Sequence, residues 1–251
     1  MNAKHKLRIV SLAPSATSIL CSIGAKGLLV GVTKWCADVA PVHDLPQLGD
    51  CWHMDTIDDL AALQPTLVVG SVPYKQETVA KLLQLQFAFL AMNPRSLADV
   101  YADIRLLGGI AGRSRNAEAV VRRLQRQFHA IARRSKSRRQ RPRVYCEAWP
   151  NPRITSPPWV AELVEIAGGK MVVPAGEKVT DEQVAEAAPD VIVLAWAATG
   201  AKAEPKKAYR VPAWRDAPAI RNHGVLITRA LAGTFLSQRR GFYNCKSIHA
   251  D

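Results

Sequence analysis

The sequence predicts an α/β protein of two pseudo-symmetric lobes, each built on a parallel sheet and joined by one long rigid helix. Three observations support this fold class. Short apolar runs typical of buried strands alternate with helical patterns in both halves of the chain. The segments TIDDLAALQPTLVV (56–69) and TDEQVAEAAPDVIV (180–193) share a threonine, an acid in third place, an alanine, a proline and an apolar strand. Between the halves, residues 113–134 repeat apolar side chains at helical spacing.

Length and composition fit two lobes of ordinary size. The chain has 251 residues, 48% of them hydrophobic and 22% charged, and no apolar run approaches the roughly 18 residues that a membrane span requires. We expect an N-terminal lobe over 1–112, an interlobe backbone helix over 113–140 and a C-terminal lobe over 141–251, with an atypical tail from residue 230. A cleft between two such lobes is a natural ligand site.

The N-terminal lobe begins with KLRIVSL (6–12), which predicts a buried strand because its apolar residues are nearly contiguous. The next segment leads through a turn into a helix that ends near Gly24, and Ser96 is expected to cap a later helix with Asp99 three residues on. The expected strands are 6–12, 27–33, 66–70 and 87–92, and the expected helices are 13–25, 56–65, 75–86 and 96–109.

The long central helix carries most of the positive charge. Residues 105–143 hold twelve arginines and one lysine against a single acid, Glu118, so 13 − 1 = 12 of the net charge of +13 lies there. A basic stripe on a helix is also the electrostatic footprint of nucleic-acid binding. Interleaved aromatic residues and a reading motif are missing, however, so we interpret the arginines as a solvated helix face and expect no nucleic-acid partner.

The C-terminal lobe restarts the alternation with a strand over 143–147, helices over 158–169 and 180–189, and a strand over 190–196. The segment CEAWPNPRITSPPW (146–159) contains four prolines, which fix φ and remove backbone donors. We therefore expect a stiff loop that forms the lip of the cleft and holds Trp149 against a ligand, the alternative being packing in the protein's own core. Pro158 is expected in the first turn of the following helix.

The cysteines and the N-terminus both favour a reducing compartment. Five cysteines are widely spaced without a CxxC pair, so neither a disulfide framework nor a structural zinc site is predicted. The opening MNAKHKLRIVSL passes directly into a strand without the apolar stretch of a secretory signal. We expect a cytoplasmic protein from the sequence as written, and an upstream start codon that restores a signal is the alternative.

Several motifs resemble those of the helical-backbone substrate-binding proteins of ABC transporters, in particular the cobalamin-binding and iron-siderophore-binding group. The similar segments are RIVSLAPSATSIL, LVGVT with CADVAP, LGDCWHMDTIDDLAALQPTLVV and ITSPPWVAELVEIAGG, and together they cover about residues 7–228. The resemblance implies two α/β lobes bridged by one rigid helix, with the ligand clamped in the cleft between them.

The resemblance also implies which residues contact a corrinoid. Trp35 occupies the place of an aromatic residue that lines the cobalamin cleft, and Trp52 matches a cleft tryptophan directly. Pro14 and Ser15 stand where the family's backbone touches the ligand near a helix N-terminus. The C-terminal lobe departs from the pattern, because Gly176 replaces a contacting tryptophan and the aromatic expected at position 148 appears one place later.

Position along the chain adds further candidates to this ligand set. Trp35, Trp52, Trp149 and Trp196 fall at predicted strand ends or in loops after strands, where open α/β sheets bind ligands. We interpret Glu147 as a contact to amide groups on the corrin rim. Cys36 and His53 are candidate axial metal ligands, although a lone histidine or cysteine near a cleft is more often a satisfied polar or small apolar residue.

Asp58 and Glu182 match two surface acids, one per lobe, that dock on arginines of the transporter in the family. The internal repeat places them at equivalent positions independently of the resemblance. An acid at a helix start is also favourable for the helix macrodipole alone, so capping is the alternative role. We expect a monomer whose protein partner is an ABC permease.

We therefore expect a corrinoid, cobalamin or cobinamide, to bind without chemical change and without a catalytic cofactor, because no catalytic motif is present. The alternatives are a ferric siderophore or haem as ligand, and a cytoplasmic corrinoid-processing protein. The tail ALAGTFLSQRRGFYNCKSIHAD does not match the family's closing helix. It is either a divergent or a frame-shifted end.

Overall fold

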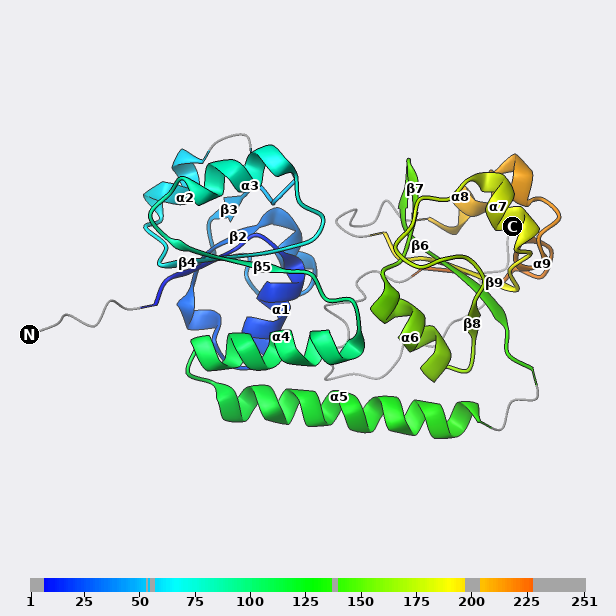
Figure 1. The fold of residues 1–251 in the computed structure, drawn as a ribbon, viewed down its shortest axis with the longest axis horizontal. Helices are drawn as coiled ribbons and strands as arrows, with labels where there is room; N and C mark the ends of the chain where they lie inside the picture. The colour runs from blue at the N-terminus through cyan, green and yellow to red at the C-terminus, as the bar shows by residue number, and fades with distance from the viewer. Residues whose placement is uncertain (1–6, 53, 55–56, 137–139, 197–203, 228–251) are drawn as a thin grey trace, which may run out of the picture. The chain divides into compact units, whose positions relative to one another are not determined.

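The computed structural model describes residues 7–52, 54, 57–136, 140–196 and 204–227 (Figure 1). These residues divide into two compact units. Of the described residues, the first unit contains those between 7 and 94 together with 98–123, and the second contains 95–97 and those between 124 and 227. Residues 95–97 join the second unit because the backbone N–H of Leu97 donates to the carboxylate of Glu162, at 3.2 Å to Oε1. None of the described helices is long and apolar enough to cross a membrane.

The first unit is built on a five-stranded parallel sheet in the order β3-β2-β1-β4-β5. Helices α2 and α3 cover one side of this sheet, and α1 and α4 lie on the other (Figure 1). Val10 and Val68 pack with Leu60 of α2 and Leu82 of α3 in the core. The elements are β1 (Ile9–Ser11), α1 (Pro14–Ser22), η1 (Lys26–Leu28), β2 (Leu29–Thr33), η2 (Lys34–Asp38), β3 (Gln47–Leu48), α2 (Asp58–Ala62), β4 (Leu67–Ser71), α3 (Gln76–Leu83), β5 (Ala88–Met92) and α4 (Leu97–Ile110).

The second unit has a mixed sheet in the order β10-β9-β6-β7, with β8 paired to the beginning of β6. All of its pairs are parallel except β6 with β7. Tyr145, Ile192 and Trp214 form its core on the side covered by α7 to α9, and α6 lies on the other side (Figure 1). The elements are β6 (Arg143–Pro150), β7 (Arg153–Thr155), α6 (Pro158–Ile166), β8 (Lys170–Met171), α7 (Asp181–Glu186), β9 (Val191–Leu194), α8 (Pro205–Tyr209), η4 (Pro212–Trp214), α9 (Pro218–Arg221) and β10 (Val225–Ile227).

The proline-rich segment 146–159 is not the loop that its composition predicts. Strand β6 continues to Pro150, and the chain returns as β7 in an antiparallel hairpin that pairs Trp149 with Ile154. The prolines avoid the paired interior, because Pro150 ends one strand and Pro152 lies in the turn, where no ladder donor is lost. Pro158 is the first residue of α6, as predicted.

Helix α5 (Ser114–Ser135) is one uninterrupted helix of 22 residues, and it confirms the predicted amphipathic pattern. Its buried side consists of Ala117, Val120, Val121, Leu124 and Phe128. The first half belongs to the first unit, where Asn116 Nδ2 donates to the carbonyl of Ile23 at 2.8 Å. The second half belongs to the second unit, where Ser135 Oγ donates to the carbonyl of Ile166 at 2.9 Å.

Helices α1 and α6 confirm the predicted pseudo-symmetry at the level of their ends. Each has nine residues, begins with proline at its first position and lacks a side-chain cap. Each is followed by a glycine with positive φ, Gly24 at 76° and Gly168 at 84°, which a residue with a Cβ adopts only at a cost. Near each helix end, α5 binds a carbonyl: that of Ile23, directly before Gly24, and that of Ile166, two residues before Gly168.

The internal repeat extends to the backbone between α2 and β4 and between α7 and β9. Gln64 (φ 46°) and Ala188 (φ 40°) both adopt the left-handed region immediately before a proline. An arginine closes each turn: Arg8 Nη2 donates to the carbonyl of Leu63 at 2.7 Å, and Arg143 Nη2 donates to the carbonyl of Ala187. The two halves thus share a bend and its hydrogen-bond partner as well as a sequence pattern.

Candidate functional site

The predicted ligand residues of the first unit lie at the carboxyl ends of its strands. Strands β1 and β4 are adjacent, and their crossover helices α1 and α3 leave on opposite sides of the sheet, which makes this a switch point of the type that binds ligands in open α/β sheets. Pro14 and Ser15 begin α1 directly after β1 and are half-buried. Trp35 lies in η2 after β2, and Trp52 follows β3.

The two tryptophans of the first unit differ in exposure. Trp52 leaves 48% of its surface exposed, and its backbone N–H donates to Asp50 Oδ1 at 2.8 Å. Trp35 is half-buried, with Lys34 Nζ 4.7 Å from its ring centroid. The structure adds Val72, which is 43% exposed directly after β4 and carries no sequence signal that separates it from a core valine.

Cys36, a candidate axial ligand, is a satisfied core residue. Its Sγ accepts a hydrogen bond from Thr17 Oγ1 at 3.1 Å and lies 3.2 Å from Thr33 Oγ1. Its side chain is fully buried, and this burial raises the pKa of the thiol. The thiolate form that binds metals is therefore disfavoured. His53 lies outside the described residues, among which no cluster of three or more potential metal ligands occurs.

In the second unit, Trp149 is exposed and Trp196 is buried. Trp149 lies near the end of β6, is 40% exposed and donates its Nε1–H to the carbonyl of Asn151 at 2.9 Å. Trp196 follows β9 and is 7% exposed. Its Nε1–H donates to Glu147 Oε1 at 2.8 Å, so this indole packs in the core beneath the strand ends.

Glu147 is the centre of a buried hydrogen-bond network. Its side chain is 1% exposed, Tyr145 donates to Oε2 at 2.7 Å, and Arg153 Nη1 forms an ion pair with the same oxygen. Arg153 Nε also donates to Asp181 Oδ1 at 2.6 Å. Burial raises the pKa of Tyr145, so its hydroxyl stays protonated and remains a donor.

This network joins several elements around a buried centre, and Asp181 at its edge is partly exposed. Buried charges persist only when they are paired and hydrogen-bonded, as Glu147 and Arg153 are here. Arg153 also stacks on the ring of Trp214, with its Cζ 4.3 Å from the centroid. The sequence analysis missed Arg153 because a pairing across the β6–β7 turn follows only if that segment is a hairpin.

The two candidate docking acids are exposed in the first turns of equivalent helices. Asp58 is the first residue of α2, which precedes β4, and Glu182 lies in the first turn of α7, which precedes β9. A helix that crosses over into a parallel strand starts at the carboxyl end of the sheet. Each acid therefore lies at the same end of its sheet as the tryptophans of its own unit. Hydrogen bonds from the backbone and from Thr180 lower the pKa of Glu182.

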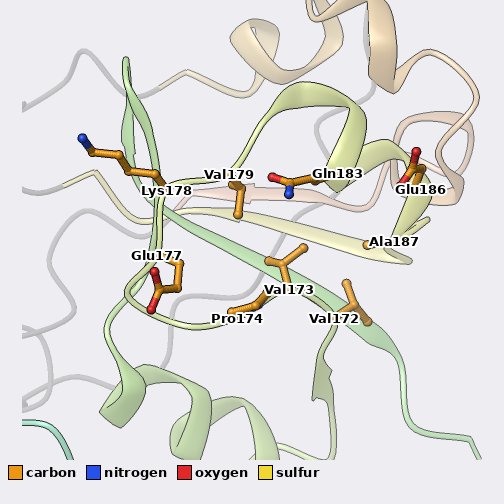
Figure 2. A pocket seen from close by; sticks show the side chains of 9 residues that line it. All are labelled: Val172, Val173, Pro174, Glu177, Lys178, Val179, Gln183, Glu186 and Ala187. Atoms are coloured by element: carbon orange, nitrogen blue, oxygen red, sulfur yellow. The ribbon is translucent and has the colours of Figure 1, made fainter.

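A shallow pocket lies beside α7 in the second unit (Figure 2). Val172, Val173 and Pro174 form its apolar side, and the charged Glu177 and Glu186 stand at its edges (Figure 2). Its nine lining residues include no aromatic side chain and none of the predicted ligand residues. We therefore assign the candidate ligand site to the strand ends and not to this pocket.

Comparisons with known proteins agree with this architecture. The family described as "Periplasmic binding protein" matches residues 9–231. An uncharacterized ABC transporter substrate-binding lipoprotein of Bacillus subtilis (strain 168), YvrC, is 25% identical over 245 residues, which cover 90% of this chain and 76% of the relative. A vitamin B12-binding protein of Pectobacterium atrosepticum is 23% identical over 199 residues, covering 74% of this chain and 71% of the relative.

Solved structures show the same fold at low sequence identity. The periplasmic vitamin B12-binding protein BtuF of Vibrio cholerae has a TM-score of 0.70 at 21% identity, covering 91% of this chain and 92% of its own. The periplasmic haem-binding protein HutB of Vibrio cholerae has a TM-score of 0.72 at 18% identity, covering 92% of both chains. These likenesses establish the two-lobed fold and do not distinguish between the two ligands.

Proposed function

The chain belongs to the periplasmic binding protein family, and from this membership we propose that it is the substrate-binding component of an ABC uptake system whose ligand is a corrinoid. The observation that carries the proposal is the exposure of Trp52 and Trp149 at the carboxyl ends of the strands of their units. Exposed indoles on a scaffold with buried cores are suited to packing on a large flat ligand.

Each predicted ligand residue receives a role in this proposal. In the first unit, Trp52 and the half-buried Trp35 supply apolar faces suited to a ring system, and in the second unit Trp149 supplies another. The start of α1 has no side-chain cap, so the backbone N–H of Ser15 is suited to an amide oxygen of the corrin rim, and Pro14, which has no N–H, offers an apolar contact. We assign the remaining two residues, Glu147 and Trp196, a positioning role, because both are buried and bonded to each other.

Haem and corrinoids differ in what they require of the protein's metal ligands, and a named relative favours a corrinoid. Haem iron takes its axial ligand from the protein, whereas the cobalt of cyanocobalamin already carries both of its axial ligands. Cys36, the described candidate, is buried with its sulfur hydrogen-bonded. The relative from Pectobacterium, matched over 74% of this chain, is named as a vitamin B12-binding protein.

We further propose that the protein acts outside the cytoplasm beside a permease. The relatives are named as a lipoprotein or as periplasmic proteins, so the cytoplasmic location expected from the N-terminus finds no support in them. Asp58 and Glu182 are exposed, one in each unit, and are our candidates for pairing with arginines of the permease. Transport then requires binding and release only, without chemistry on the ligand.

The test is calorimetric titration of the protein with cyanocobalamin, cobinamide, haemin and a ferric siderophore. Saturable binding of one corrinoid per chain is expected. Binding of haemin alone would show that the family assignment holds and the ligand assignment is wrong, and a His53→Ala variant would then identify the axial ligand. The absence of saturable binding with all four ligands would overturn the site at the strand ends.

A further inference from the structure

Helix α5 presents a single row of arginines. Arg115, Arg122, Arg126 and Arg133 are separated by seven, four and seven residues, and His129 falls between the last two. At 3.6 residues per turn, these spacings place all of them within a narrow stripe along one side of the helix. Each of these arginines is exposed. We call the four the arginine face.

The arginine face points away from the core of either unit. The buried residues Ala117, Val121, Leu124 and Phe128 define the inner side of α5, and the helical spacing puts the arginines on the opposite side. The segment 105–143 contains one acid, Glu118, which lies 2.8 Å from Arg105 and 3.8 Å from Arg122. Like charges four residues apart destabilise a helix, so an inert surface would gain from mixed signs.

We propose that the arginine face binds the anionic phosphate surface of a phospholipid bilayer. The inference rests on the proposed function in one respect, namely that the protein works beside a membrane. Four arginines on one straight helix span 18 residues, or about 27 Å, and so form a linear row suited to a planar array of phosphates. Guanidinium groups bind phosphate oxygens in a bidentate manner and remain charged at any physiological pH.

A bilayer suits this surface better than a nucleic acid does. Binding of single strands relies on aromatic side chains interleaved with the basic ones, and the aromatic residue of α5, Phe128, is buried. Attraction to anionic lipid needs only clustered positive charge within a Debye length of the surface. The four exposed arginines of the arginine face meet that requirement.

The contacts of α5 indicate what a bound protein would present to solvent. In the first unit, α5 binds the C-terminal end of α1 through Asn116 and Ile23, and this end lies at the amino ends of the strands. Pro14 and Trp52 lie at the opposite, carboxyl end. A bilayer bound to the arginine face therefore leaves this part of the candidate site open to ligand, which describes an orientation for capture.

The experiment is flotation of the full chain with vesicles of equal parts phosphatidylglycerol and phosphatidylcholine. The variant Arg115→Gln/Arg126→Gln/Arg133→Gln is compared with a control of equal charge, Lys81→Gln/Arg210→Gln/Arg215→Gln, whose residues are exposed outside α5. At about five-fold per arginine near an anionic surface, we expect the first variant to bind roughly 100-fold more weakly and the control to bind nearly as wild type. Pure phosphatidylcholine should bind neither.

Two further measurements separate this inference from the proposed function. Circular dichroism and corrinoid affinity should be unchanged in the arginine variant, so a failure of ligand binding in wild type leaves the vesicle result intact. If both variants lost vesicle affinity equally, net charge alone would explain the binding, and the proposal would be overturned. If the protein bound random duplex DNA more tightly than vesicles at about 0.15 M salt, a nucleic acid would be the partner of the arginine face, and the proposal would also be overturned.

Discussion

At the residue scale, Trp52 and Trp196 show where sequence reasoning succeeds and where it ends. Trp196 follows β9, a strand that the sequence predicts, whereas Trp52 follows the short strand β3, which the sequence did not predict. One indole is 48% exposed and the other 7%. The sequence predicts the end of a strand from the end of an apolar run, but burial at that end depends on long-range partners such as Glu147, which contacts Trp196 across 49 residues.

Replacing Trp52 should weaken the ligand and spare the fold. Trp52→Ala removes an exposed indole, and the loss of one stacking face, about 1–3 kcal/mol by analogy with bases on aromatic side chains, corresponds to roughly ten- to hundred-fold in corrinoid affinity. Calorimetric titration measures the change. Tyr209→Ala is the matched control, because Tyr209 is 38% exposed at a position away from the strand ends. Equal affinities for wild type and the Trp52 variant would remove Trp52 from the site.

Replacing Arg153 should destabilise the second unit. Arg153→Ala leaves Glu147 buried and without its counter-charge, which typically costs about 3 kcal/mol or more. Urea unfolding followed by tryptophan fluorescence measures this loss in the free energy of unfolding. Arg221→Ala is the control, because the pair of Arg221 with Asp216 is exposed on both sides and should matter little. If the two variants were equally stable, the network would contribute no more than a surface pair.

At the element scale, the sequence did not predict the hairpin β6–β7, but its internal repeat did predict the equivalence of the segments that lead into β4 and β9. Proline content predicted a loop over 146–159, yet Pro150 ends β6, Pro152 lies in the turn, and Pro157 and Pro158 stand at the start of α6, so none interrupts the interior of a strand. The repeat of 56–69 in 180–193 did predict equivalent helices and strands. It did not predict the arginines that close both turns, because Arg8 and Arg143 lie far from the repeat in sequence.

Replacing an alanine by glycine should change the stability in opposite directions at the bend before β9 and within the preceding helix α7. Ala188 adopts φ of 40°, where a Cβ costs about 1–2 kcal/mol, so Ala188→Gly should stabilise the protein by up to about 1 kcal/mol after the loss of chain entropy is counted. Ala185→Gly, within α7, is the control and should destabilise it by a similar amount. Thermal unfolding distinguishes the signs. Destabilisation by both glycines would contradict a strained bend.

At the scale of the whole molecule, the family, the two α/β lobes and the connecting helix were predicted from the sequence and are confirmed. A corrinoid was also predicted as the ligand, and this stays a prediction, because a neighbour of the same fold, HutB, is named as a haem-binding protein. In our proposal, specificity depends on a few side chains at strand ends. These contribute little to the periodicity from which the fold is predicted.

Asp58 and Glu182, the candidate docking acids, should affect the whole molecule's interaction with a permease. Reversing both charges in the double variant Asp58→Lys/Glu182→Lys should abolish permease-coupled uptake and leave corrinoid affinity within about two-fold, since both acids are exposed. Uptake of labelled corrinoid by cells, with calorimetry on the purified chain, measures the two effects separately. Glu77→Lys/Glu186→Lys is the control, with one exposed acid reversed in each unit. Normal uptake by the first variant would leave helix capping as the role of both acids.

The bend that precedes β4 and β9 has a consequence for how the two halves came to differ. Glutamine stands at one bend and alanine at the other, yet both chains turn the same way, meet a proline and receive an arginine from the neighbouring strand. What the halves hold in common is therefore the path of the backbone together with the proline and the arginine that define it. A segment exchanged between the two halves would meet the same bend and the same hydrogen-bond donor at its destination.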